Sequence, residues 1–262
     1  MPIRLAVLAF ALGCCACGSS EPKPAAPPKI TNFALQSRLM GRQMYEVLVT
    51  PANGGKGRPL LVFLHGSGAA PSDIADPAFL SAVRKLGDRA PAVLLPEGDI
   101  GFWHDRVGQP WGSYVLREAI PDALRRSGAD SKRVAIGGIS MGGFGSLDLG
   151  RIAAKRFCAV GGHSPAVFFR YSNDLFGAFD GSADFARHDL LRLARHRSPY
   201  RAPVWIDIGA DDYLRPGAAA LADELKAGGA DVTFHVWPGS HNGQYWDAHF
   251  AQYLRFYADA CS

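Results

Sequence analysis

The stretch Gly138-Ile139-Ser140-Met141-Gly142 decides the fold of this chain. It follows the apolar run 133–137 and leads into the glycine-rich segment 142–145, after which the spacing becomes helical. This order predicts a strand, a sharp turn and a helix, with Ser140 at the turn. Glycines two residues before and after the serine let the backbone pass close to its neighbours, because a Cβ at either position would clash. Such a strained turn presents a serine hydroxyl as a nucleophile.

Apolar runs alternate with helical patterns along the rest of the chain. Asp76-Pro77 is an N-cap followed by proline at the first helical position, which begins one of the helices. The alternation predicts an α/β fold with a doubly wound, mostly parallel sheet. No repeat or linker divides residues 33–262, so we expect one domain there. Strands are expected at 45–49, 60–64, 92–95, 133–137, 157–161, 204–208 and 232–236, and helices at 76–86, 114–124, 190–195, 218–227, 246–257 and directly after Ser140.

Composition and charge limit the function classes. The chain has 262 residues, 48% apolar and 11% aromatic, which is enough to bury a substantial core. Its net charge is +4, from 28 Lys and Arg against 24 Asp and Glu. A nucleic-acid-binding protein would concentrate its basic residues on one stripe. Here they are scattered, and we interpret the one modest run as a solvated helix face: Arg187, Arg192, Arg195 and Arg197. We expect no nucleic-acid partner.

A nucleophilic serine needs a histidine to take its proton and a carboxylate to orient that histidine. In folds with this turn, acid and histidine follow the serine in that order, each on a loop at the carboxyl end of a strand. The strand 204–208 runs into a loop with Asp211 and Asp212, and the strand 232–236 runs into a loop with His241. These two loops are where the partners of Ser140 are expected.

Each role has competing candidates. Asp211 and Asp212 both suit the acid, whereas Asp207 lies inside a strand. For the base, His235 lies on a strand and His249 inside a helix, so the loop residue His241 is favoured. One donor to the oxyanion of the tetrahedral intermediate should be the Met141 N–H, directly after the nucleophile at the start of its helix.

Four motifs resemble the esterase D-like branch of the α/β-hydrolases. That branch includes S-formylglutathione hydrolases, feruloyl and acetylxylan esterases, and mycolyltransferases. The resemblance spans about residues 44–258 and implies the α/β-hydrolase fold and a serine esterase that works through an acyl-enzyme. It also implies that Asp212 is the acid and that the Ser67 N–H is the second oxyanion donor. The motifs are Leu64-His65-Gly66-Ser67-Gly68, Gly138-Ile139-Ser140-Met141-Gly142-Gly143, Gly209-Ala210-Asp211-Asp212 and Pro238-Gly239-Ser240-His241.

Two alternatives to ester hydrolysis stay open. The same three residues would serve an acyltransferase that uses a sugar or lipid acceptor in place of water. A non-catalytic binding protein on a hydrolase scaffold is the other alternative. Such proteins typically lose one of the three residues, and none is missing here.

Substrate and cofactor signals are weaker. Sites favour loops, so we expect four aromatic or imidazole side chains to border the substrate pocket: Trp103, His104, Trp111 and His163. The substrate is expected to be a small-molecule, polysaccharide or lipid ester. No Cys/His cluster has metal-ligand spacing and no glycine loop precedes Lys-Ser or Lys-Thr, so we expect no metal and no cofactor.

The N-terminal sequence is typical of an export signal. Residues 1–17 combine one positive charge with the apolar run 5–12, which is shorter than the ~20 residues that span a bilayer. Ala11-Leu12-Gly13-Cys14 resembles a bacterial lipobox, which predicts a lipid anchor at Cys14 and a place in the cell envelope or periplasm. Ordinary secretion with cleavage near Ala16 is the alternative.

Residues 18–32 are rich in proline and predict an extended tether between the signal and the catalytic domain. Only two cysteines follow it, Cys158 and Cys261. An oxidising compartment would permit a disulfide between them, but two buried thiols are an equal alternative.

Overall fold

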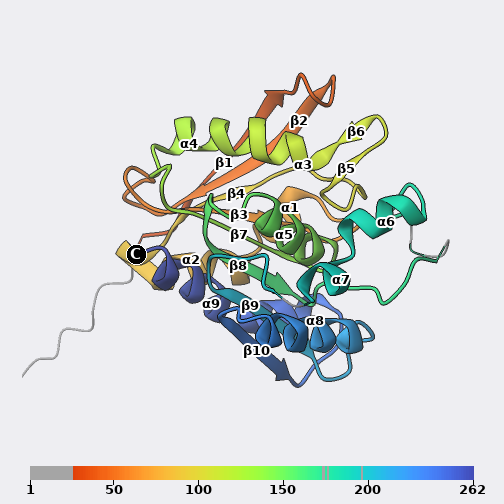
Figure 1. Cartoon of the computed structure of the whole chain (residues 1–262). Coiled ribbons are helices and arrows are strands. Elements are labelled where there is room, and N and C mark those ends of the chain that lie inside the picture. Colours follow the sequence, from red (N-terminus) through yellow and green to blue (C-terminus); the bar gives the residue numbers. More distant parts are fainter. Residues whose placement is uncertain (1–25, 173–174, 176, 196) are drawn as a thin grey trace, which may run out of the picture.

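An eight-stranded sheet forms the centre of the molecule in the computed structural model, which describes residues 26–172, 175, 177–195 and 197–262 (Figure 1). The strand order is β1-β2-β4-β3-β7-β8-β9-β10. Strands β1, β2 and β4 pair antiparallel and all other neighbours pair parallel, which confirms the mostly parallel α/β sheet. The strands are β1 Lys29–Gln36, β2 Gln43–Thr50, β3 Leu60–Leu64, β4 Ala92–Leu95, β7 Val134–Ile139, β8 Phe157–His163, β9 Val204–Gly209 and β10 Val232–Trp237.

Helices cover both faces of this sheet, as its strands require. Along β3, Leu60, Val62 and Leu64 pack into one apolar cluster and Leu61 and Phe63 into the other, because successive side chains of a strand point to opposite faces. None of the described helices is both long and apolar enough to cross a membrane. The helices are α1 Pro71–Ile74, α2 Pro77–Leu86, α3 Trp111–Tyr114, α4 Ile120–Ser127, α5 Met141–Ile152, α6 Ser182–His188, α7 Leu190–Ala194, α8 Arg215–Ala227 and α9 Gly243–Ala260.

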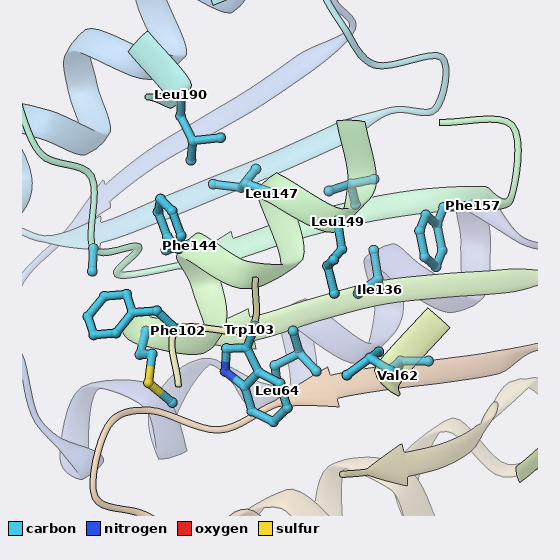
Figure 2. Packing of buried hydrophobic residues seen from close by; sticks show 14 of the residues in the cluster. Val62, Leu64, Phe102, Trp103, Ile136, Phe144, Leu147, Leu149, Phe157 and Leu190 are labelled. Carbon is cyan, nitrogen blue, oxygen red and sulfur yellow. The ribbon is translucent and has the colours of Figure 1, made fainter. Parts of the chain in front are cut away.

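The two layers are unequal in size. Helices α1, α2 and α9 pack on the smaller cluster, and α3, α4, α5, α7 and α8 contribute to the larger one. Figure 2 shows Leu149 of α5 beside Ile136 of β7 in the larger cluster, and Phe144 and Leu147 on the side of α5 toward Leu190. The helix that begins at the sharp turn is therefore buried between the sheet and the outer helices, which holds the turn in place.

Several elements differ from the sequence expectation. Strand β1 begins at Lys29, so the folded part reaches into the tether expected over 18–32. Its polar, weakly alternating sequence gives little strand signal, and its pairing with β2 supplies the order. Helix α6 and the short hairpin of β5 (Asp105–Arg106) and β6 (Gln109–Pro110) were also not expected.

The helix expected over 114–124 is longer than predicted. It begins with α3 at Trp111, passes through the π-helical turn Val115–Ala119 and ends with α4 at Ser127. Pro121 lies inside this continuous helix, directly after the π-helical turn, so its missing N–H removes one helical hydrogen bond. The Leu116 carbonyl, five residues earlier, accepts a hydrogen bond from Arg156 Nη1 instead.

A disulfide joins Cys158 of β8 to Cys261 directly after α9, with Cα atoms 5.4 Å apart. The sequence left this pairing open. The bond ties the end of the last helix to the centre of the sheet across a sequence separation of 103 residues. A cross-link of this kind typically stabilises a fold by about 2–4 kcal/mol. It also anchors the helix whose first turn follows His241.

Candidate active site

Ser140 lies at the turn between β7 and α5 with φ +57° and ψ −115°, a conformation that strains a residue with a Cβ. Its N–H donates to the His163 carbonyl at 2.9 Å, and its carbonyl accepts the Phe144 N–H at 3.0 Å. A Cβ on Gly138 would lie 2.6 Å from the Leu64 carbonyl oxygen, and one on Gly142 would collide with the same group. The two glycines thus permit the turn for the reason that the sequence predicts.

Ser140, His241 and Asp212 form a continuous chain of hydrogen bonds. His241 Nδ1 is 2.8 Å from Asp212 Oδ2, and His241 Nε2 is 2.9 Å from Ser140 Oγ. A carboxylate only accepts, so the imidazole hydrogen lies on Nδ1 and Nε2 offers its lone pair to the serine hydroxyl. The Asp212 side chain is fully buried, and its Oδ1 accepts the Leu214 N–H at 2.9 Å. Asp211, its rival, is exposed.

The histidine rivals are occupied elsewhere. His235 stacks between Trp205 and Trp237, at 4.7 and 4.6 Å between ring centroids. The His249 ring is parallel to the Trp237 ring, with centroids 4.2 Å apart. Its Nδ1 donates to the Tyr245 carbonyl at 2.6 Å. The tertiary structure therefore brings His241 alone of these three to Ser140.

Asp207 belongs to a separate buried network. Its carboxylate accepts four hydrogen bonds: from His163 Nδ1 at 2.6 Å, Trp205 Nε1 at 2.9 Å, Tyr245 OH at 2.8 Å and Tyr253 OH at 2.7 Å. Burial and the charge of Asp207 raise the pKa of both tyrosines well above the ordinary value, so their hydroxyls stay protonated and donate. This network ties β8, β9 and α9 together next to the loop that carries His241.

The loop after β3 approaches Ser140 from the other side. A Cβ on Gly66 would lie 3.4 Å from Ser140 Cβ, so the loop passes in van der Waals contact with the nucleophile. His65 holds it there: its Nδ1 donates to the Gly66 carbonyl at 2.8 Å, and its Nε2 accepts the Gly98 N–H at 3.1 Å. Burial lowers the pKa of His65, which keeps this ring neutral. Ser67 and Met141, the predicted oxyanion donors, both line the pocket beside Ser140.

The model of the Esterase family matches residues 37–257. The chain belongs to this family. This assignment agrees with the resemblance to the esterase D-like branch, and the chain is a carboxylic ester hydrolase with the α/β-hydrolase fold. A curated acetyl esterase from Caldicellulosiruptor saccharolyticus is 25% identical over 183 residues, which is 61% of this chain and 69% of that protein.

Solved structures share the fold of this esterase. A ferulic acid esterase superposes with a TM-score of 0.78 at 19% identity, covering 89% of this chain and 98% of the other. An S-formylglutathione hydrolase from Agrobacterium tumefaciens superposes with a TM-score of 0.74 at 20% identity, covering 90% and 96%. Identities this low establish the common fold only.

A cavity of about 490 Å³ opens beside Ser140 and His241 in this esterase. Most of its wall is apolar, and three acidic residues also line it: Asp73, Asp76 and Asp247. Burial, followed by the charge of the neighbouring Asp76, raises the pKa of the Asp247 carboxyl. Of the apolar wall residues, only Ile139 and Met141 belong to a motif that the sequence analysis singled out. The apolar members are Ala69, Ile74, Phe102, Ile139, Met141, Ala166, Phe168, Leu214, Trp246 and Phe250.

The four side chains expected in the substrate pocket lie elsewhere. Trp103, His104, Trp111 and His163 are at most 2% exposed, and none lines the cavity. Trp103 fills the space next to Gly98 and Gly145, where a Cβ on either glycine would collide with its indole. The loop turns inward at Phe102 and Trp103, which have φ of +52° and +63°. Burial of these large rings stabilises the fold more than exposure at a cleft would. Of the two residues at this turn, Phe102 lines the cavity and Trp103 does not.

A group of side chains that could bind a metal ion lies away from Ser140. Among the residues that the structure describes, one group of three is placed to hold an ion: His104, Asp184 and His188. None of the three lines the cavity beside Ser140. The sequence spacing did not predict this group, because His104 is 80 residues from Asp184 along the chain.

Proposed function

We propose that this esterase hydrolyses neutral carboxylic esters through an acyl-enzyme formed on Ser140. The chain of hydrogen bonds from Asp212 through His241 to Ser140 is the observation that carries the proposal. It ends at the mouth of an apolar cavity large enough for an acyl group. Nucleophile, base and orienting acid are thus in the order that acyl transfer requires.

The first half of the reaction forms the acyl-enzyme. Ser140 Oγ attacks the ester carbonyl carbon while His241 Nε2 takes the hydroxyl proton. The resulting oxyanion accepts hydrogen bonds from the backbone N–H groups of Met141 and Ser67, and the N-terminal end of α5 favours its negative charge. The carbon–oxygen bond to the alcohol then breaks, and His241 returns the proton to the departing alcohol. Asp212 stabilises the imidazolium while it exists.

The second half regenerates the enzyme. Water attacks the acyl carbon and gives a proton to His241 Nε2. The bond from the acyl carbon to Ser140 Oγ breaks, the serine recovers that proton, and the carboxylic acid leaves. The same backbone donors hold the second oxyanion. An alcohol acceptor in place of water would make the reaction an acyl transfer, so analysis of the products with sugar and lipid alcohols is part of the test.

The cavity wall indicates the substrate class. Its aromatic and aliphatic side chains suit a short or aromatic acyl group, whereas its acidic residues disfavour an anionic substrate. The similarity to an acetyl esterase and the fold shared with a ferulic acid esterase support the same range of acyl groups. A series of p-nitrophenyl esters from acetate to laurate, together with feruloyl and anionic succinyl esters, measures this preference. A preference for long or anionic acyl groups would contradict it.

The nucleophile is tested by substitution and labelling. Ser140→Ala should lower kcat on p-nitrophenyl butyrate by about 10⁴–10⁶-fold. The same variant should not react with a fluorophosphonate probe. Ser131→Ala removes an exposed serine and serves as the matched control, which should keep full rate and labelling. Full activity of the Ser140 variant would contradict the proposal.

We further propose that the esterase is exported and anchored in the cell envelope by a lipid on Cys14. Cys14 and the tether up to residue 25 lie outside the described residues. Support comes from the lipobox-like sequence and from the Cys158–Cys261 disulfide, because disulfides persist in oxidising compartments.

A further inference from the structure

A second cluster of chemically active side chains lies in the larger layer, apart from the cavity at Ser140. His104 comes from the loop before β5, and Asp184 and His188 lie one turn apart on α6. All three are buried, and their ligand atoms lie within 4.8 Å of one another. His104 Nε2 is 3.2 Å from Asp184 Oδ2, and His188 Nε2 is 3.7 Å from Asp184 Oδ1.

The other nitrogen of each imidazole ring also has an acceptor beside it. His188 Nδ1 is 2.8 Å from Asp148 Oδ2, and His104 Nδ1 is 3.3 Å from the Phe102 carbonyl oxygen. Both partners only accept, so the His188 hydrogen lies on Nδ1, toward Asp148. His104 has an acceptor at each nitrogen, the Phe102 carbonyl at Nδ1 and Asp184 at Nε2, and one hydrogen on its ring satisfies one of the two. With the His104 hydrogen on Nδ1, the Nε2 atoms of both rings face the carboxylate of Asp184 with their lone pairs.

Asp184 is itself held as an acceptor. Its Oδ2 accepts the Asp180 N–H and its Oδ1 accepts from Arg187 Nη2, both at 2.9 Å. In that tautomer two imidazole lone pairs and a carboxylate converge in a buried space. One additional proton on a ring would satisfy one of these contacts, whereas a divalent cation would satisfy all three.

The surroundings match those of protein metal sites. Metal-binding histidines usually donate their second ring hydrogen to a carboxylate or a backbone carbonyl, and the cluster contains one example of each. Tetrahedral zinc with ligands at its usual bond lengths places neighbouring donor atoms about 3.3 Å apart. The distance from His104 Nε2 to Asp184 Oδ2 is 3.2 Å, and that from His188 Nε2 to Asp184 Oδ1 is 3.7 Å. Asp148 also pairs with Arg151 at 2.6 Å, which suits a carboxylate that orients His188 better than one that binds the ion.

We propose that His104 Nε2, His188 Nε2 and the Asp184 carboxylate bind one divalent transition-metal ion. Imidazole and carboxylate donors favour Zn²⁺ among the common candidates. Because all three residues are buried, the ion has a structural role. It joins α6 to the loop that carries Phe102, whose ring forms part of the cavity wall.

Metal binding to the tag-free esterase tests the proposal directly. The protein is treated with a chelator, dialysed, and titrated with Co²⁺ or Zn²⁺ at neutral pH. We expect one ion per chain by mass spectrometry of the metal, visible absorption bands from bound Co²⁺, and a thermal midpoint raised by about 5–10 °C at a large excess of Zn²⁺ over its Kd. Absence of a stoichiometric ion, with an unchanged midpoint, would mean a shared proton only and would overturn the proposal.

Variants locate the ion. Asp184→Asn and His188→Gln keep the shape of the side chain and should lose both the Co²⁺ absorption and the Zn²⁺-dependent rise in the midpoint. His235→Gln is the control, because His235 is a half-buried histidine outside the cluster and stacks on Trp237. Loss of Co²⁺ binding in this control, with binding retained in Asp184→Asn, would assign the ion to a site at His235 and overturn the proposal. The measurement on the wild-type protein stands even where a variant fails to fold.

Discussion

Trp103 Nε1 donates a hydrogen bond to the His65 carbonyl at 3.2 Å, so a buried indole braces the loop that carries Ser67. The two rings also meet edge to face, with centroids 5.0 Å apart. Trp103 packs against α5 through Gly145 as well. One side chain therefore contacts both segments that supply the proposed oxyanion donors, and Figure 2 shows it beside Leu64 at the end of β3.

Trp103→Phe should weaken catalysis by loosening this loop. We expect kcat on p-nitrophenyl butyrate to fall about tenfold with little change in KM, a fraction of the ~10²–10³ that loss of a whole oxyanion donor costs. Trp111→Phe is the matched control, because Trp111 is equally buried but donates to Gln109 Oε1 at 3.3 Å. Both variants should lose about 1–3 kcal/mol in the free energy of unfolding. Equal kcat values in the two variants would show that Trp103 only packs.

Asp212→Asn should keep the fold and disable the base. An amide that donates to His241 Nδ1 would place the ring hydrogen on Nε2, facing Ser140, and kcat should fall about 10⁴-fold. Asp211→Asn changes the exposed neighbour and should cost little. Steady-state kinetics and circular dichroism of both variants check this. A large loss of kcat in the Asp211 variant alone would assign the orienting role to Asp211.

The lowered pKa of His65 predicts that the esterase loses stability as the pH falls. Burial lowers the pKa of His65 in the folded protein, so the unfolded chain binds the proton more readily. The stability that comes from the neutral ring is present above the ordinary histidine pKa of about 6.5 and is lost as the pH falls from there through the folded-state pKa.

His65→Gln isolates this contribution because glutamine does not titrate. Urea unfolding between pH 7 and pH 5 should show a smaller fall in the free energy of unfolding for the variant than for the wild-type protein. His249→Gln, which changes a less buried histidine, is the control. Identical pH dependence in all three proteins would contradict the prediction.

Cys14→Ser tests the proposed lipid anchor. The wild-type protein should fractionate with membranes and incorporate a labelled fatty acid. The variant should lose the label together with its membrane association or its processing. Cys17→Ser, three residues further on, should behave as the wild type. Recovery of wild-type protein in the soluble secreted fraction would favour ordinary cleavage near Ala16.

Local rules made much of the fold predictable. Strands β3, β4 and β7 are short, mainly apolar runs, because burial on both faces of the sheet favours apolar side chains. Asp76 caps α2 by accepting the Phe79 N–H, as its place before Pro77 predicts. The turn at Ser140 was predictable because glycine sterics act within a few residues, and the loops with Asp212 and His241 followed from the order of the strands.

Other features were decided by contacts between distant segments. Asp211 and Asp212 are chemically equal in the sequence, and only the fold turns one toward His241 and the other to solvent. Trp103, His104, Trp111 and His163 stand in polar, glycine-rich surroundings typical of an exposed loop, yet the chain folds them inward. His104 meets Asp184 across 80 residues, and Cys158 meets Cys261 across 103. Periodicity and glycine positions report the local backbone, whereas which side chains share a buried space depends on how the packed layers fill their volume, and that is a property of the tertiary structure.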